Sequence, residues 1–351
     1  MTSQHARTTL EMPTGKPPAE DNAVTTTNGW RPSLLRLTER FGLVMLLLGV
    51  AIYFALDPAT SATFPTVSNL RNIVANDSVL ILAALAALIP LVAHRFDLSV
   101  GAIVALTSIA AAKATTSMEL PILVGVVIAV TIGALVGLAN GILIAYFRAN
   151  SLVITLGMAT LLGGVASAWS GHQTIVGVPV TLTNFGNGLW FGVPRPVYLV
   201  IVASLAVSFL LGLTIFGRRL LSVGVNETAA HLVGLPVQRT VALAFVASGA
   251  LAGLAGALLL ARTGSAASGV GVGYLLPALA AIFLGSTTIC PGRYTVAGTL
   301  VGVFFVAISI NGLTLAGAAD WVEPAFNGGA VIVAVAVSSL LTHRRLTGAS
   351  R

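Results

Sequence analysis

The segment GRRLLSVGVNETAAHLVGLP, from Gly217 to Pro236, is a polar insert between two long apolar runs. Its second half predicts a short helix: Asn226 can cap the first turn, Glu227 favours that turn, and Gly234 ends the helix. A short helix outside an apolar domain is suited to binding in a groove on a partner. The sequence therefore predicts an apolar domain that carries a small docking element.

The composition indicates a polytopic, all-α membrane protein. Of 351 residues, 56% are hydrophobic and 8% are charged, whereas soluble domains carry about 25% charged residues. The net charge of +7 is expected to set the orientation in the membrane rather than to bind nucleic acid. The single cysteine, Cys290, excludes an intrachain disulfide and a cysteine-cluster metal site.

Apolar runs of about the length that crosses a bilayer, roughly 20 residues, predict ten transmembrane helices. They fall at 41–56, 78–94, 98–116, 122–147, 151–169, 198–216, 240–261, 274–288, 295–315 and 324–342. The predicted organisation is a transmembrane domain at 41–342, a polar and then basic tail at 1–40, and a short tail at 343–351. Two segments outside the spans stand out: the insert at 217–239 and a loop at 170–197.

The distribution of basic residues predicts the orientation. Ten spans put both termini on one side of the membrane. If that side is the cytoplasm, 14 arginines and lysines lie on the inner face and four on the outer face. Because cytoplasmic segments of membrane proteins are enriched in basic residues, the N- and C-termini and the insert at 217–239 are expected in the cytoplasm. The loop at 170–197 is expected outside.

Glycines spaced four residues apart predict closely packed helices. The spacing occurs in three of the predicted spans, at Gly133, Gly137 and Gly141, at Gly249 and Gly253, and at Gly298 and Gly302. Such spacing lets two helix backbones approach each other. Packing within the chain is favoured over dimerisation as the reason for it.

Three motifs resemble those of one transporter family. The pattern Glu227-x-Ala229-Ala230-x-x-x-Gly234 resembles the EAA-type coupling motif of ABC importer permeases. The preceding GRRL, which starts at Gly217, is similar to the form in the ribose, xylose and arabinose branch of those permeases. The sequence DLSVG, which starts at 97, resembles a signature of the same family. The resemblance covers about residues 60–342.

The chain departs from the family pattern at two places. Thr228 stands where the family usually has a second acid after the glutamate of the coupling helix. The segment 93–96, with the sequence AHRF, stands where a glycine-rich approach commonly precedes the aspartate signature. These departures concern the docking of the ATPase and the turn between the second and third spans.

The resemblance implies the permease subunit of a monosaccharide importer in a bacterial inner membrane. It implies as partners two cytoplasmic ABC ATPase subunits, an extracytoplasmic sugar-binding protein and a second permease chain, identical or different, with a sugar as the solute. The residues implied in ATPase coupling are Arg218, Arg219, Asn226, Glu227, Ala229, Ala230 and Gly234. The residues assigned to the translocation path or a gate are Asp97, Ser99, Asn140 and Asn311.

Two interpretations remain open for these polar residues of the spans. Asp97 can cap the third span through the amides of Ser99 or Val100. It can also lie on the solute path or at a gate, because acids inside a membrane are costly and usually functional. Asn140 and Asn311 can bind sugar hydroxyls, or they can form hydrogen bonds between helices.

The sequence has no pattern typical of an enzyme, a cofactor site or a metal site. A nucleotide-binding P-loop needs a lysine followed by a hydroxyl residue, but Lys16 precedes Pro17 and Lys113 precedes Ala114. The five histidines are scattered without metal-ligand spacing. ATP hydrolysis is therefore expected in a partner subunit. The alternative functions are an ion-coupled secondary transporter of a small polar solute and a membrane-embedded enzyme.

Overall fold

The computed structural model of the protein describes residues 31–348 of the chain, with the side chains of 41–336. Predictions for residues 1–30 and 349–351 lie outside this part. The helices are α1 (Arg31–Leu56), α2 (Val67–Val92), α3 (Val100–Thr116), α4 (Ile122–Ala145), α5 (Ser151–Ser170), α6 (Val180–Asn187), α7 (Arg195–Gly212), α8 (Ile215–Val225), α9 (Glu227–Leu232), α10 (Val237–Thr263), the 3-10 turn η1 (Val270–Tyr274), α11 (Leu275–Gly285), α12 (Val296–Leu315) and α13 (Val322–Gly348). The strands β1 (Leu189–Trp190) and β2 (Val193–Pro194) form one antiparallel hairpin.

Six of these helices are long and apolar enough to cross a membrane, namely α2, α4, α5, α7, α10 and α12. Four shorter apolar stretches, at Phe41–Leu56, Val100–Thr116, Val270–Gly285 and Val322–Ala336, coincide with the other predicted spans. The prediction of an all-helical protein with several membrane spans is confirmed. Helices suit a membrane because each satisfies its backbone polar groups with its own hydrogen bonds. The count of ten crossings stays a prediction.

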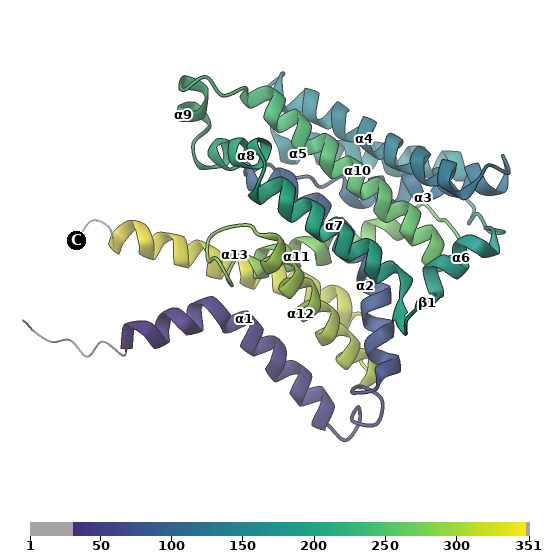
Figure 1. Cartoon of the computed structure of the whole chain (residues 1–351), viewed down its shortest axis with the longest axis horizontal. Coiled ribbons are helices and arrows are strands. Elements are labelled where there is room, and N and C mark those ends of the chain that lie inside the picture. Colours follow the sequence, from purple (N-terminus) through teal and green to yellow (C-terminus); the bar gives the residue numbers. More distant parts are fainter. Residues whose placement is uncertain (1–30, 349–351) are drawn as a thin grey trace, which may run out of the picture.

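The helices surround α2. Its residues from Ser78 to Val92 are all buried, and α2 packs against α7, α10, α11 and α12. In Figure 1, α8 and α9 lie at the left end of the molecule, together with the start of α1 and the end of α13. The short helix α6 and the strand β1 lie at the right end (Figure 1). The polar insert and the loop at 170–197 are thus at opposite ends.

The glycine spacing accounts for the closest helix contact. Gly133 of α4 faces Gly249 and Gly253 of α10, and a Cβ added at Gly133 would lie 3.0 Å from the Cα of Gly253. Farther along the same contact, a Cβ at Gly141 would lie 2.8 Å from the Cα of Ala242. These distances are shorter than carbon–carbon van der Waals contact, so only glycine fits. The prediction that these glycines pack within the chain is confirmed.

Several predicted helix boundaries are wrong. The first helix begins at Arg31 and not at 41, and the last ends at Gly348 and not at 342. The sixth span was placed at 198–216, but α7 ends at Gly212 and a separate helix, α8, begins at Ile215. Thr214 separates them, because its Oγ1 accepts a hydrogen bond from the Gly217 amide at 3.1 Å and so caps α8. The second span was expected to begin at 78, whereas α2 begins at Val67. Its cap, Thr66, was overlooked in a segment rich in polar residues.

The contact between α4 and α10 gives a stability prediction. We expect Gly133→Ala to lower the free energy of unfolding, because overpacking a closely packed contact typically costs about 1–3 kcal/mol. The matched control is Gly49→Ala in α1, where nothing lies within 4 Å of an added Cβ. The check is the midpoint of thermal unfolding of the purified protein in detergent. An unchanged midpoint for Gly133→Ala would contradict the packing argument.

Candidate functional site

The helix α9 has the local structure that its sequence predicts. The Oδ1 atom of Asn226 accepts a hydrogen bond from the Ala229 amide at 2.9 Å and caps the helix. After its last turn the chain reverses at Gly234, whose φ of 80° is one that glycine adopts readily. Ala230 is buried against the domain. The remaining residues assigned to ATPase coupling, Arg218, Arg219, Glu227 and Ala229, are exposed.

The outer surface of α9 is unusually apolar for an exposed helix. The side chain of Leu232 is 80% exposed and that of Val233 is 75% exposed. Leu232 lines the same pocket as Glu227, and Val233 directly follows the helix. Exposed apolar side chains rimmed by charge are typical of a surface that a partner protein covers.

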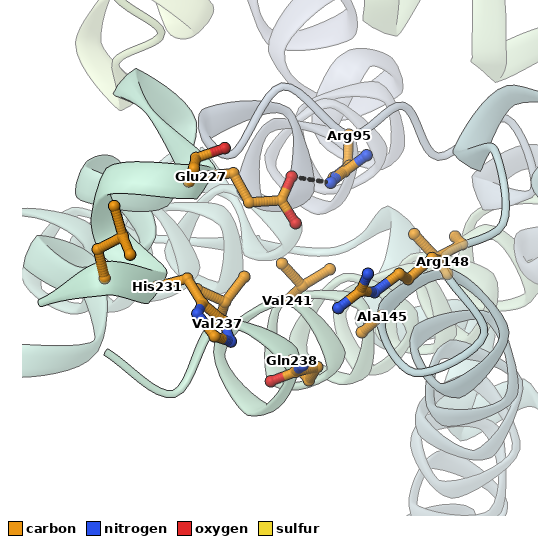
Figure 2. Close-up of a pocket in the computed structure, with 11 residues that line it drawn as sticks. Arg95, Ala145, Arg148, Glu227, His231, Val237, Gln238 and Val241 are labelled. Atoms are coloured by element: carbon orange, nitrogen blue, oxygen red, sulfur yellow. Dashed lines mark hydrogen bonds and ion pairs between the residues drawn. The ribbon is translucent and has the colours of Figure 1, made fainter. Parts of the chain in front are cut away.

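One ion pair connects α9 to the rest of the domain. The Nη2 atom of Arg95 lies 2.5 Å from the Oε2 atom of Glu227, with the two side chains 29% and 51% exposed. Figure 2 shows this pair at the edge of a pocket of about 460 Å³, which His231, Gln238 and Arg148 also line. Arg95 belongs to the turn between α2 and α3. The pair therefore joins two segments that are 132 residues apart in the sequence.

Two residues beyond Arg95, the same turn carries the buried carboxylate of Asp97. Its Oδ1 accepts hydrogen bonds from the amide of Ser99 at 3.0 Å and from the Ser99 hydroxyl at 2.6 Å. Its Oδ2 accepts a hydrogen bond from Ser248 Oγ of α10 at 2.9 Å. Asn140 of α4 completes the group, because its Nδ2 donates to Ser99 Oγ at 2.9 Å. We call Asp97, Ser99, Asn140 and Ser248 the aspartate cluster.

The aspartate cluster is closed to solvent. Asp97 is 1% exposed, and the other three side chains are completely buried. No described basic side chain forms an ion pair with Asp97, so hydrogen bonds offset the cost of burying its charge. The Oδ1 atom of Asn140 has no hydrogen-bond partner among the described residues. The cluster thus joins the α2–α3 turn to α4 and α10, as the interhelical interpretation of Asn140 expected.

The turn that carries Asp97 is also held by α5. The amide of Phe96 donates to Ser151 Oγ at 3.3 Å, and the amide of Leu98 donates to Thr155 Oγ1 at 3.1 Å. Thr155 Oγ1 itself donates to the Ser151 carbonyl oxygen at 2.7 Å. Hydroxyls on α5 therefore satisfy the backbone of the turn on either side of Asp97, and they hold it in one position.

Asn311 is not part of the aspartate cluster. It lies on α12, where it exchanges two hydrogen bonds with Asn69 of α2, at 2.8 and 3.1 Å. Asn311 lines a different pocket, together with Asp77 and Glu323. Sequence reasoning missed these two acids. The second span is predicted to begin at 78, which leaves Asp77 just outside it. The helix α2 in fact begins at Val67, and the sequence signal for that start is its cap residue, Thr66.

The aspartate cluster gives a second stability prediction. We expect Asp97→Ala to destabilise the protein by roughly 3 kcal/mol, because hydrogen bonds to a charged group are each worth about 1.5–3 kcal/mol and the buried donors of Ser99 and Ser248 lose their acceptor. Asp97→Asn keeps one carbonyl acceptor, so its loss should be smaller. Thermal unfolding in detergent measures both. Equal stability of Asp97→Ala and the unchanged protein would contradict the role given to the cluster.

Comparison with known proteins identifies the family. A family model described as "Branched-chain amino acid transport system / permease component" matches residues 69–336. The chain is 33% identical to the ribose import permease protein RbsC of Escherichia coli (strain K12) over 310 residues, which cover 86% of this chain and 94% of that protein. It is 30% identical to the L-arabinose ABC transporter permease protein AraH of Azospirillum brasilense over 328 residues, 93% of this chain and 95% of that protein.

A third relative is the autoinducer 2 import system permease protein LsrD of Yersinia enterocolitica, which is 33% identical over 262 residues, 73% of this chain and 79% of that protein. No solved structure is significantly similar to the chain. The resemblance to monosaccharide importer permeases is confirmed, and the matched description is that of a transport component rather than an enzyme. The chain therefore belongs to the family of branched-chain amino acid transport system / permease components, as a multi-pass protein of the inner membrane.

Proposed function

We propose that the chain forms the path of a monosaccharide through the membrane and is driven by separate cytoplasmic ATPase subunits. The assignment of a sugar as the transported solute is supported by the relatives named for ribose and arabinose. The proposal that a separate subunit hydrolyses ATP is supported by the sequence, since neither Lys16 nor Lys113 is followed by the hydroxyl residue of a P-loop. An extracytoplasmic sugar-binding protein delivers the solute, and a second permease chain, identical or different, completes the path.

The proposed topology has ten crossings with both termini in the cytoplasm. It is supported by the six long apolar helices and the four shorter ones. It is also supported by the excess of basic residues, 14 against four, on the side that would face the cytoplasm. The start of α1, the end of α13 and the helix α9 lie together at one end of the molecule (Figure 1), as this topology requires. The loop at 170–197 then faces outward.

The observation that carries the proposed mechanism is the ion pair between Arg95 and Glu227. In the proposed complex, the ATPase subunits bind the segment that runs from α8 to the turn after α9. The coupling residues that they contact are Arg218 and Arg219 of α8, Asn226, Glu227 and Ala229 at the start of α9, and Gly234 after it, while the buried Ala230 packs α9 against the domain. Closure of the ATPase on ATP moves α9, and Glu227 pulls on Arg95. Arg95 is two residues from Asp97, so the motion reaches the aspartate cluster directly through the backbone of the turn.

In this mechanism the aspartate cluster is a gate rather than a sugar site. Its side chains are buried and already bonded to one another, so a sugar has no access to them in the described conformation. A shift of the α2–α3 turn breaks the bond from Ser248 and separates this turn from α10. Such a change replaces one set of hydrogen bonds by another, which suits a two-state element.

One observation favours the alternative of an ion-coupled secondary transporter. Asp77 and Glu323 line one pocket among membrane helices, and intramembrane acids are typical of proton and sodium pathways. The two mechanisms differ in their energy source. Uptake that stops with a protonophore but continues without the ATPase subunits would favour the secondary transporter.

The ion pair gives a prediction for coupling. We expect Glu227→Ala and Arg95→Ala to lower sugar uptake by about tenfold, because coupling free energies between sites of about 1–3 kcal/mol correspond to 5–150-fold effects. Stability should hardly change, since an exposed ion pair is worth about 0–1 kcal/mol. Uptake and ATP hydrolysis are measured side by side in proteoliposomes that contain the permease, its ATPase and its binding protein.

The matched control for these variants is Glu119→Ala, which removes an exposed acid beyond the far end of α3. The double variant Arg95→Glu with Glu227→Arg exchanges the two charges and should recover part of the uptake that is lost when either substitution is made alone. If ATP hydrolysis and uptake fall in the same proportion, the pair only helps the ATPase to bind. If uptake is normal in both alanine variants, the proposed route from α9 to the turn is wrong.

A further inference from the structure

A second pocket lies at the opposite end of α2 from the turn that carries Arg95. It has a volume of about 430 Å³ and is enclosed by α2, η1, α11, α12 and α13. Its polar lining residues are Asn76, Asp77, Tyr274, Asn311, Thr314 and Glu323. We call it the outer pocket, because the proposed topology places it in the external half of the membrane domain. Its volume is in the range of pockets that hold small molecules, about 300–1,000 Å³.

The two acids of the outer pocket lack partners in the described part of the protein. Asp77 accepts no hydrogen bond from a described side chain or amide, and neither Asp77 nor Glu323 forms an ion pair there. The nearby cation, Arg262, forms an ion pair with neither acid. Its guanidinium donates to Asn76 Oδ1, which belongs to the lining of the outer pocket, to the Gly186 carbonyl at 2.9 Å and to Asn187 Oδ1 at 2.8 Å. The carboxylate oxygens are therefore free to accept hydrogen bonds from a solute.

The side-chain amide of Asn311 is fixed by hydrogen bonds but keeps positions at which it can bond to another molecule. Asn69 bonds to both its oxygen and its nitrogen, and Asn69 Nδ2 lies 3.0 Å from the Phe64 carbonyl as well. A carboxamide has two N–H donors and two acceptor positions. One donor and one acceptor position of Asn311 thus remain for a bound molecule, in a fixed orientation.

The rest of the outer pocket is apolar. Ile73, Leu80, Pro277 and Val306 line it, and the ring of Tyr274 adds an aromatic face. A monosaccharide has the matching chemistry, because its hydroxyls donate to carboxylates and amides while its C–H faces pack on rings and aliphatic side chains. Within the described residues, no group of three or more His, Cys, Asp or Glu side chains is placed to hold a metal ion.

We propose that the outer pocket is the membrane-domain binding site for a neutral monosaccharide, with Asp77 accepting from sugar hydroxyls, Asn311 donating and accepting, and Tyr274 packing on the ring. This rests on the proposed sugar-import function and adds the place where the solute binds. The site is distinct from the aspartate cluster, whose polar atoms are buried and bonded to each other. The solute thus enters at one end of α2 and passes the gate at the other.

The test is protection of an engineered cysteine by sugar. Thr314→Cys is made in a Cys290→Ala background, and a membrane-impermeant maleimide is added from outside to proteoliposomes that contain the whole importer. D-ribose, L-arabinose, D-xylose and the amine D-glucosamine are added in turn. We expect one neutral sugar to slow labelling about fivefold when present at about four times its Kd. Asp77→Asn should abolish this protection, whereas Glu119→Gln should keep it.

The outcomes separate the inference from the proposed function. If a sugar is taken up with ATP but none protects Thr314→Cys, the site is wrong and the importer function stands. If no sugar is taken up with ATP, the function fails and the inference fails with it. Protection by D-glucosamine alone would overturn the choice of a neutral solute. If Thr314→Cys does not insert, Ile310→Cys on the same wall replaces it.

Discussion

The backbones of α4 and α10 are in direct contact, and this contact positions the buried polar groups of the domain. Gly133 and Gly253 let the two helices approach until their backbones touch. In lipid the helices gain little from hydrophobic burial, so close packing and interhelical hydrogen bonds must supply the stability. The same approach brings Asn140 and Ser248 to the turn with Asp97. A wider separation would leave a buried carboxylate without enough donors.

Three groups of polar residues lie at different positions along α2. At one end, charged and apolar side chains of α9 are exposed, and among the described residues one ion pair connects them to the domain. Near that end lies the aspartate cluster, whose side chains are buried and bonded to one another. At the other end, the outer pocket is lined by two acids that form no ion pair among the described residues and by the amide of Asn311, which Asn69 holds in place. Because α2 is buried along most of its length, it is the element that connects all three.

The features of the fold that depend on neighbouring residues could be predicted from the sequence. The cap of α9 at Asn226 and its end at Gly234 depend on neighbouring residues, and both follow from the sequence. Glycine spacing predicted tight packing, although not which helices meet. The partners of Asp97 were not predictable, because Ser248 is 151 residues away. Asp77 was missed for a different reason: hydropathy does not register the polar first turns of α2, which Thr66 caps.

The ion pair between Arg95 and Glu227 has a consequence for the history of the family. Each residue is partly exposed and free to mutate as far as folding is concerned, yet each is useful only while the other keeps the opposite sign. Lineages that change the charge at one position should therefore carry the compensating change at the other. A change of charge in α9 would then be matched in the α2–α3 turn, 132 residues away in the sequence.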